Sequence, residues 1–309
     1  MKETGKLSRR NLLQGASAIA AAGALGAANA LAADQLPASN LPGSGGKPRA
    51  LALIGDRYHN QNDIRIALNR VFRELGISID YTTNYYDLSA GLLKPYQLFV
   101  GLRDDMIWPG GYLQTAIPGP SGLPSRSPGE DPGVFPPEKA EYWISEEQGK
   151  AVKDFVASGN SFYSYHNNAF VSRSSKNYRE VQGGWALSHP PLRPFKVKIV
   201  NKNHPITQGV EDFMVTDEQH YLVYEKDPKN ILLQSENIDG LTFTPSLRDP
   251  DQPDAPSKDV GTGSVSGWAH EYGKGRVVFT AMGHTIDAMW QPEYLKIQKN
   301  AVRWLLRMS

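Results

Sequence analysis

The sequence has 309 residues, with 33 Lys and Arg against 32 Asp and Glu, so its formal net charge is only +1. This balance gives no electrostatic reason to expect nucleic acid as a partner. The chain contains no cysteine, which excludes disulfides, thiolate catalysis, cysteine-ligated zinc and iron–sulfur clusters. Its length and its hydrophobic fraction of 40% fit a globular protein of one or two domains.

The N-terminal segment has the features of an export signal. Residues 8–14 read SRRNLLQ, an Ala-rich apolar run covers residues 16–28, and small-residue cleavage sites follow at 28–30 and 30–32. We therefore predict a twin-arginine signal peptide over residues 1–32, the twin-arginine export machinery as a partner, and a periplasmic or secreted location. The apolar run is short and consists mostly of Ala and Gly, so no stable membrane span is expected.

After the signal, residues 33–47 are rich in Ala, Pro, Ser and Gly and are predicted to be a flexible linker before a domain over residues 48–309. Residues 49–55 form a short apolar run ending in glycine, which is typical of a buried parallel strand. Apolar residues at helical spacing from Ile64 onwards predict a helix that ends at Gly76. Further strands are predicted over residues 77–81, 96–101 and 161–165.

Later elements continue this alternation. Ser145 and Gln148 have the spacing of a capping box, so a helix is predicted to begin there and to end at Gly159. A hairpin is expected over residues 268–282, followed by a closing helix with an apolar face from Ile297 to Met308. The pattern predicts an α/β fold with an open, mainly parallel sheet and helices on both faces. For residues 183–262 two layouts stay open, an extension of the sheet or a separate antiparallel ribbon.

Histidines follow three of the predicted strands. His59 comes shortly after the first strand, His166 ends the strand that begins at Ser161, and His284 follows the second strand of the hairpin. A single histidine in such a place is more often a hydrogen-bonded core or loop residue. Three at the carboxyl edge of one sheet indicate a shared site at the rim of a crevice. Glu218 and His220 are further candidates near a later strand.

Four motifs occur in the second half of the chain, at residues 159–166, 204–209, 217–218 and 268–277. In this order they resemble the ThuA-like (trehalose utilisation) family. The resemblance extends from about Pro48 to the C-terminus, and it implies a flavodoxin-like fold related to that of the class I glutamine amidotransferases. In those enzymes a nucleophilic cysteine follows a glycine by seven positions. That interval, counted from Gly159, ends here at His166, and their base histidine is matched by His284.

The replacement of a nucleophilic cysteine by histidine rules out glutaminase chemistry. Converging imidazoles with a carboxylate can instead bind a divalent metal ion, zinc or similar, or act as general acid and base near neutral pH. We predict catalytic roles for His166, Glu218 and His284, and a metal site formed by these three residues together with His59. No local metal motif supports this ligand set, so the fold must assemble it.

A sugar-sized ligand is suggested by two features near the histidines. Residues 103–143 form a long, Pro- and Gly-rich connection with several aromatic residues, which either stack on sugar rings or fix the loop to the surface. Amide and guanidinium groups that can bind hydroxyls follow His166 directly. The residues predicted to bind substrate are His59, Trp108, Asn167, Asn168, Arg173 and His220.

Two functions are compatible with these features. The first is an exported enzyme of carbohydrate catabolism, a hydrolase or isomerase that acts on a disaccharide or keto sugar by metal-assisted or histidine acid–base chemistry. The second is a non-catalytic carbohydrate-binding or accessory protein. A stoichiometric metal ion would favour the enzyme.

Overall fold

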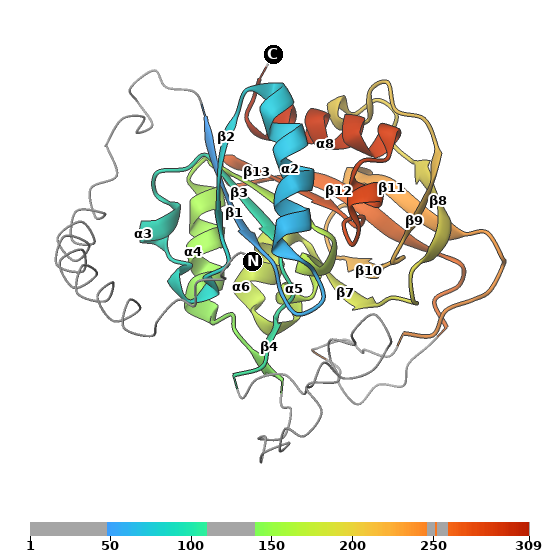
Figure 1. The fold of residues 1–309 in the computed structure, drawn as a ribbon, viewed down its shortest axis with the longest axis horizontal. Coiled ribbons are helices and arrows are strands. Elements are labelled where there is room, and N and C mark those ends of the chain that lie inside the picture. The colour runs from blue at the N-terminus through green and yellow to red at the C-terminus, as the bar shows by residue number, and fades with distance from the viewer. Residues whose placement is uncertain (1–47, 110–139, 246–250, 252–258, 309) are drawn as a thin grey trace, which may run out of the picture. The chain divides into compact units, whose positions relative to one another are not determined.

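The computed structural model describes residues 48–109, 140–245, 251 and 259–308, and Figure 1 shows their arrangement. The predicted signal peptide and linker, residues 1–47, lie outside the described residues. The same holds for residues 110–139 of the long aromatic connection, which include Tyr112 and Phe135.

A nine-stranded sheet forms the centre of the domain, in the order β2-β1-β3-β6-β13-β12-β11-β8-β9. Its first five strands are parallel and carry the helices on both faces. The predicted α/β fold class is therefore confirmed. These five strands are β1 (Arg49–Ile54), β2 (Ser78–Thr82), β3 (Leu98–Leu102), β6 (Ser161–Tyr165) and β13 (Gly275–Thr280).

The other half of the sheet is antiparallel. The predicted hairpin joins β12 to β13, and the remaining strands continue outward from it. Both layouts considered for residues 183–262 occur, because β7 and β10 pair apart from the main sheet as a two-stranded ribbon. These strands are β7 (Gly184–Ser188), β8 (Arg193–Ile199), β9 (Phe213–Asp217), β10 (Tyr221–Tyr224), β11 (Ile231–Asn237) and β12 (Gly263–Tyr272), and a short pair consists of β4 (Met106–Ile107) and β5 (Glu141–Tyr142).

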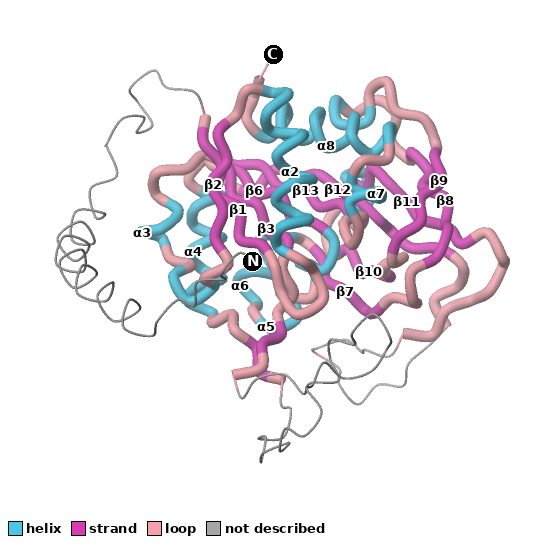
Figure 2. Tube along the Cα trace, in the orientation of Figure 1, coloured by secondary structure: helices cyan, strands magenta, loops and turns pink. Residues whose placement is uncertain are grey.

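Helices cover the two faces of the parallel half (Figure 2). Ala50 and Ala52 of β1 pack with α2 (Gln61–Leu75) and α8 (Pro292–Leu305), whereas Leu51 and Leu53 pack with α4 (Glu146–Ala157) on the opposite face. The alternation follows from the two-residue period of a strand. The shorter helices are α3 (Ala90–Leu93), α5 (Val171–Ser174), α6 (Lys176–Gln182) and α7 (Ile286–Met289), with single 3-10 turns at Tyr85–Asp87, His166–Ala169, Pro205–Thr207 and Pro228–Asn230.

Two predicted helix ends are confirmed, the C-terminus of α2 and the N-terminus of α4. Gly76 ends α2 in the left-handed conformation, with φ 65°, and its amide donates to Arg73 and Phe72 carbonyls. Ser145 and Gln148 form the reciprocal capping box at the start of α4. None of the helices in the described part of the chain has the length and apolar character that crossing a bilayer requires.

Candidate functional site

Three histidine rings meet where β1, β6 and β13 end. His59 lies in the loop between β1 and α2, His166 directly follows β6, and His284 lies between β13 and α7. The ring centroid of His59 is 5.1 Å from that of His166 and 4.8 Å from that of His284. The carboxyl ends of parallel strands thus bring together side chains that are far apart in sequence.

His166 occupies a tight turn between β6 and the 3-10 turn that follows. Its φ of 48° lies in the left-handed region, which is uncommon for residues other than glycine and marks local backbone strain. The close approach of the loop after β13 requires Gly283, because a Cβ there would lie 2.8 Å from the Cβ of His166. The expectation that His166 stands at a crevice rim is wrong, since its side chain is completely buried.

The tautomer of His166 is set by the backbone. Its Nδ1 lies 2.7 Å from the Ala281 carbonyl oxygen, which can only accept, so Nδ1 carries the hydrogen. The Nε2 lone pair then points toward Glu218 Oε2, 3.4 Å away, and this nitrogen has no hydrogen-bond partner among the described residues. Burial lowers the pKa of His166, but Glu218 and Asp217 outweigh this effect and raise it overall.

The orientation of His59 is set by Asp56. His59 Nδ1 donates to Asp56 Oδ1 at 2.8 Å, so Nε2 is unprotonated in the neutral ring and faces His284 Nδ1 at 3.1 Å. Burial raises the pKa of Asp56, but the hydrogen bond from His59 and those from the Asp104 and Tyr58 amides lower it to about 2. Histidines that bind a metal ion through one ring nitrogen commonly donate a hydrogen bond from the other nitrogen to a carboxylate of this kind.

Glu218 comes to the histidines from the antiparallel half of the sheet. Its Oε2 lies 3.1 Å from His284 Nδ1. Burial raises the pKa of Glu218, but the histidines that face its carboxylate, His166 first, outweigh this effect and hold the pKa far below its usual range. The preceding Asp217 is buried and accepts hydrogen bonds from the amides of Gly283 and His284, which fixes the end of β9 against the loop after β13.

The four groups have the donor chemistry of a cation site. The ligand atoms of His59, His166, Glu218 and His284 all lie within 4.8 Å of one another. Around a tetrahedral zinc ion, ligand atoms about 2.1 Å from the metal are about 3.4 Å apart. Unprotonated nitrogens and a carboxylate oxygen facing each other repel unless a proton or a metal ion lies between them. The structure therefore brings together the four residues predicted as metal ligands.

A cavity of about 550 Å³ opens beside these residues. His59, Glu218 and His284 line it, together with aromatic residues such as Tyr58 and Phe170. Its wall also contains two buried carboxyl groups, Asp104 and Asp105, that follow β3. Burial raises the pKa of both, and the neighbouring Asp105 raises that of Asp104 further. The pair thus favours a bound proton in the cavity wall.

The residues predicted to bind substrate are distributed unevenly around this cavity. Asn167 and Arg173 line it, and Asn167 Nδ2 donates to Asp56 at 2.7 Å. Trp108 is half-buried and packs edge-on against the cavity residue Tyr58. Asn168 turns into the core and donates to Ser164 and Tyr178, so the structure gives it a packing role in place of the predicted sugar contact.

His220 does not line the cavity either. Its ring is buried between the rings of His166 and His189, with centroid separations of 4.1 and 4.8 Å. This position corrects the predicted contact between His220 and a substrate. His189, which lines the cavity, was not predicted.

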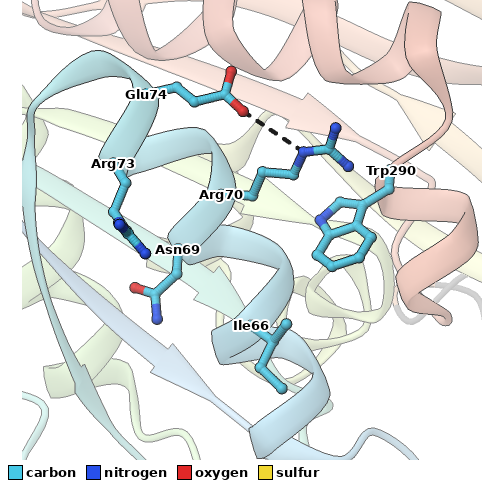
Figure 3. Close-up of a pocket in the computed structure, with 6 residues that line it drawn as sticks. All are labelled: Ile66, Asn69, Arg70, Arg73, Glu74 and Trp290. Atoms are coloured by element: carbon cyan, nitrogen blue, oxygen red, sulfur yellow. Dashed lines mark ion pairs between the residues drawn. The ribbon is translucent and has the colours of Figure 1, made fainter.

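A second hollow, of about 650 Å³, lies along the surface of α2 (Figure 3). Arg70 packs its guanidinium 5.0 Å from the Trp290 ring centroid and pairs with Glu74 at 3.6 Å. Its lining contains no histidine and shares no residue with the cavity beside His59. The histidines and the carboxylate that could bind a metal ion therefore lie beside the cavity of about 550 Å³ and not in this hollow.

Residues 133–305 match the family ThuA, described as trehalose utilisation. The matched segment is more than half of the sequence. The chain belongs to the ThuA family. The resemblance seen in the sequence motifs is thereby confirmed, over a shorter range than the predicted domain. No curated protein matches this ThuA chain.

Solved structures of ThuA-like proteins share the fold. One from Bacteroides uniformis ATCC 8492 is 17% identical, with a TM-score of 0.52 over 85% of this chain and 94% of that one. Another, from Parabacteroides merdae ATCC 43184, is 15% identical, with a TM-score of 0.52 over 84% of this chain and 90% of that one. At these identities the likeness establishes a common architecture for this ThuA chain and not a common reaction.

Proposed function

We propose that this ThuA protein is an exported, metal-dependent enzyme of sugar catabolism, a hydrolase or isomerase that acts on a disaccharide or keto sugar. The observation that carries the proposal is the convergence of His59, His166, Glu218 and His284 beside a cavity of about 550 Å³. The family's description as trehalose utilisation supports the choice of a sugar as substrate.

The hydrogen bonds around the ligand set support a metal ion. Asp56 binds Nδ1 of His59 and the Ala281 carbonyl binds Nδ1 of His166, so each ring turns Nε2 toward the centre. Such partners orient ligands and make them more basic. Three imidazoles and one carboxylate suit zinc or another divalent transition metal.

The cavity offers what a sugar reaction needs besides the ion. A bound divalent ion would polarise a carbonyl or lower the pKa of water. The aromatic faces of Tyr58 and Phe170 can stack on a sugar ring, and Arg173 can bind its hydroxyls. The Asp104–Asp105 pair can hold a proton for a leaving group or bind a hydroxyl.

The metal can be tested by elemental analysis and calorimetry of protein prepared without a histidine tag. We expect stoichiometric binding of Zn²⁺ and turnover of at least one disaccharide or keto sugar, both lost in Glu218→Gln and His284→Ala. His204→Asn is a matched control, because His204 lies outside the ligand set and caps the 3-10 turn that begins at Pro205, a role that Asn can fill.

The outcomes separate the two candidate functions. Sugar binding without any metal or turnover would instead identify a carbohydrate-binding accessory protein. Loss of metal in the His204→Asn control would show that the variants act through misfolding.

A further inference from the structure

We propose that Glu218 bridges two divalent cations, and that His189 and His220 hold the second one. The proposal rests on the function proposed above, because the first ion is the one held by His59, His166 and His284. Glu218 Oε2, His189 and His220 each offer a ligand atom, and these atoms lie within 4.8 Å of one another.

His220 is the residue that points most directly to a ligand. It is only 1% exposed, and neither of its ring nitrogens has a hydrogen-bond partner among the described residues. A neutral imidazole has one donor and one acceptor, so both are left unsatisfied in the interior, where polar groups are nearly always paired. A phenylalanine would fill the same place between two rings without that cost. A cation bound to Nε2 satisfies the acceptor and explains why a histidine stands there.

The β7–β10 ribbon places the second pair of ligands side by side. Its register pairs Ser188 with Tyr221, and His189 and His220 are their neighbours in sequence at the end of the ribbon. The two rings stack with an interplanar angle of 18° and a centroid separation of 4.8 Å. The ribbon thus presents two imidazoles to Glu218, just as the ends of β1, β6 and β13 present three.

Glu218 has more imidazole neighbours than one carboxylate oxygen can serve. Its Oε2 lies 3.1 Å from His284, 3.4 Å from His166, 3.6 Å from His189 and 3.7 Å from His220. A carboxylate oxygen has about two lone-pair directions. Two cations would use both lone pairs of Oε2, one shared with His59, His166 and His284 and the other with His189 and His220. The two ions of such paired sites in enzymes lie about 3.5–4 Å apart.

Binding of the second ion requires a small movement of its ligands toward one another. Ligand atoms around one ion are about 3.4 Å apart, slightly closer than the separations of 3.6 and 3.7 Å from Glu218 to His189 and His220. His189 can provide the movement, because its side chain is 32% exposed in the cavity wall. Its Nδ1 contacts the Pro190 carbonyl at 3.0 Å and must release that contact, or the ring must turn to present Nε2.

Metal counting on the full-length, tag-free protein tests the second site. After loading with Zn²⁺ and desalting, elemental analysis is expected to find two ions per chain in the wild type and in His204→Asn. One ion is expected in His220→Gln and in His189→Asn. After loading with Mn²⁺, the wild type should give the spin-coupled electron paramagnetic resonance spectrum of a bridged pair, and each of these two variants the spectrum of an isolated ion.

The possible failures are distinguishable. One ion in the wild type, unchanged in both variants, would overturn the second site and leave the first intact. Two ions with uncoupled spectra would overturn the bridge, and no ion at all would overturn the proposed function as well. If His220→Gln fails to fold by its melting curve, His189→Asn decides the matter, because the His189 side chain is 32% exposed and lies in the cavity wall.

Discussion

At the scale of single residues, the site depends on groups that hold protons in fixed places. The histidines could be identified from the sequence because each follows a predicted strand. The same rule would have found Asp56 after β1 and Asp104 and Asp105 after β3, had it been applied to carboxylates. Their roles, however, depend on burial and on hydrogen bonds across the fold, which spacing along the chain does not reveal.

The Asp104→Asn variant tests the proton held in the cavity wall. We expect sugar turnover to fall by about 10²- to 10⁴-fold, the usual contribution of general acid–base catalysis, while Zn²⁺ stoichiometry stays unchanged. Because burial raises the pKa of Asp104 in the folded protein, ionisation of this group at pH 7 opposes folding, and the neutral amide removes that opposition. The melting temperature should therefore stay the same or rise.

Turnover and melting should be measured on the same sample, with Asp212→Asn on the protein surface as the control. A variant of Asp104 that is less stable but fully active would show that the residue serves the fold alone.

At the scale of elements, the parallel half of the sheet and the hairpin of β12 and β13 could be predicted, whereas the rest of the antiparallel half could not. Apolar runs, a capping box and Gly76 define β1, α2 and α4 locally, so their bounds follow from the sequence. The ribbon of β7 and β10 depends on long-range pairing that no local pattern specifies. The burial of His166 could not be predicted either. The residues that cover it, Glu218 and His220, lie between β9 and β10, and their position depends on the same long-range pairing.

The contact between Gly283 and His166 gives a test at this scale. In Gly283→Ala the new Cβ would lie 2.8 Å from the Cβ of His166, so the loop after β13 must move. We expect a loss of about 1–3 kcal/mol in the free energy of unfolding, as for other overpacked sites, together with weaker Zn²⁺ binding. Urea unfolding and calorimetry measure the two effects.

Gly91→Ala is the control for this variant, because a Cβ at residue 91 has only the Ser89 side chain nearby, at 3.8 Å. Unchanged Zn²⁺ affinity in Gly283→Ala would mean that this contact does not position His166.

At the scale of the whole molecule, the proposed route to the periplasm begins with the twin arginines. Changing both Arg9 and Arg10 to Lys keeps the charge of the segment but removes the guanidinium pair on which the proposed signal depends. The precursor should then accumulate in the cytoplasm, which fractionation and immunoblotting can measure. The matched control is Lys2→Arg with Lys6→Arg, which leaves the pair intact. Export of the double lysine variant at the wild-type level would contradict the twin-arginine route.

The response of the fold to acid depends on histidines buried in their neutral form. His270 on β12 is 6% exposed, its Nε2 donates to the Val181 carbonyl at 3.0 Å, and burial lowers its pKa from 6.5 to about 4. Between these two values the unfolded chain binds a proton that the folded chain does not, so the free energy of unfolding falls as the pH falls. The contribution of His270 is complete above about pH 6.5 and is lost progressively toward pH 4.

We expect this one group to cost about 2 kcal/mol of stability between pH 7 and pH 5, at about 1.4 kcal/mol for each pKa unit. Urea unfolding at both pH values, in the presence of a chelator, compares the wild type with His270→Gln, whose side-chain amide can still donate to Val181 but does not titrate. The variant should lose less stability than the wild type on acidification, by about this amount. His204→Asn is the control, because it also removes a histidine. Burial lowers the pKa of His204 as well, but His204 is more exposed than His270. An equal loss in the wild type and His270→Gln would mean that His270 titrates in the folded protein as it does in the unfolded chain.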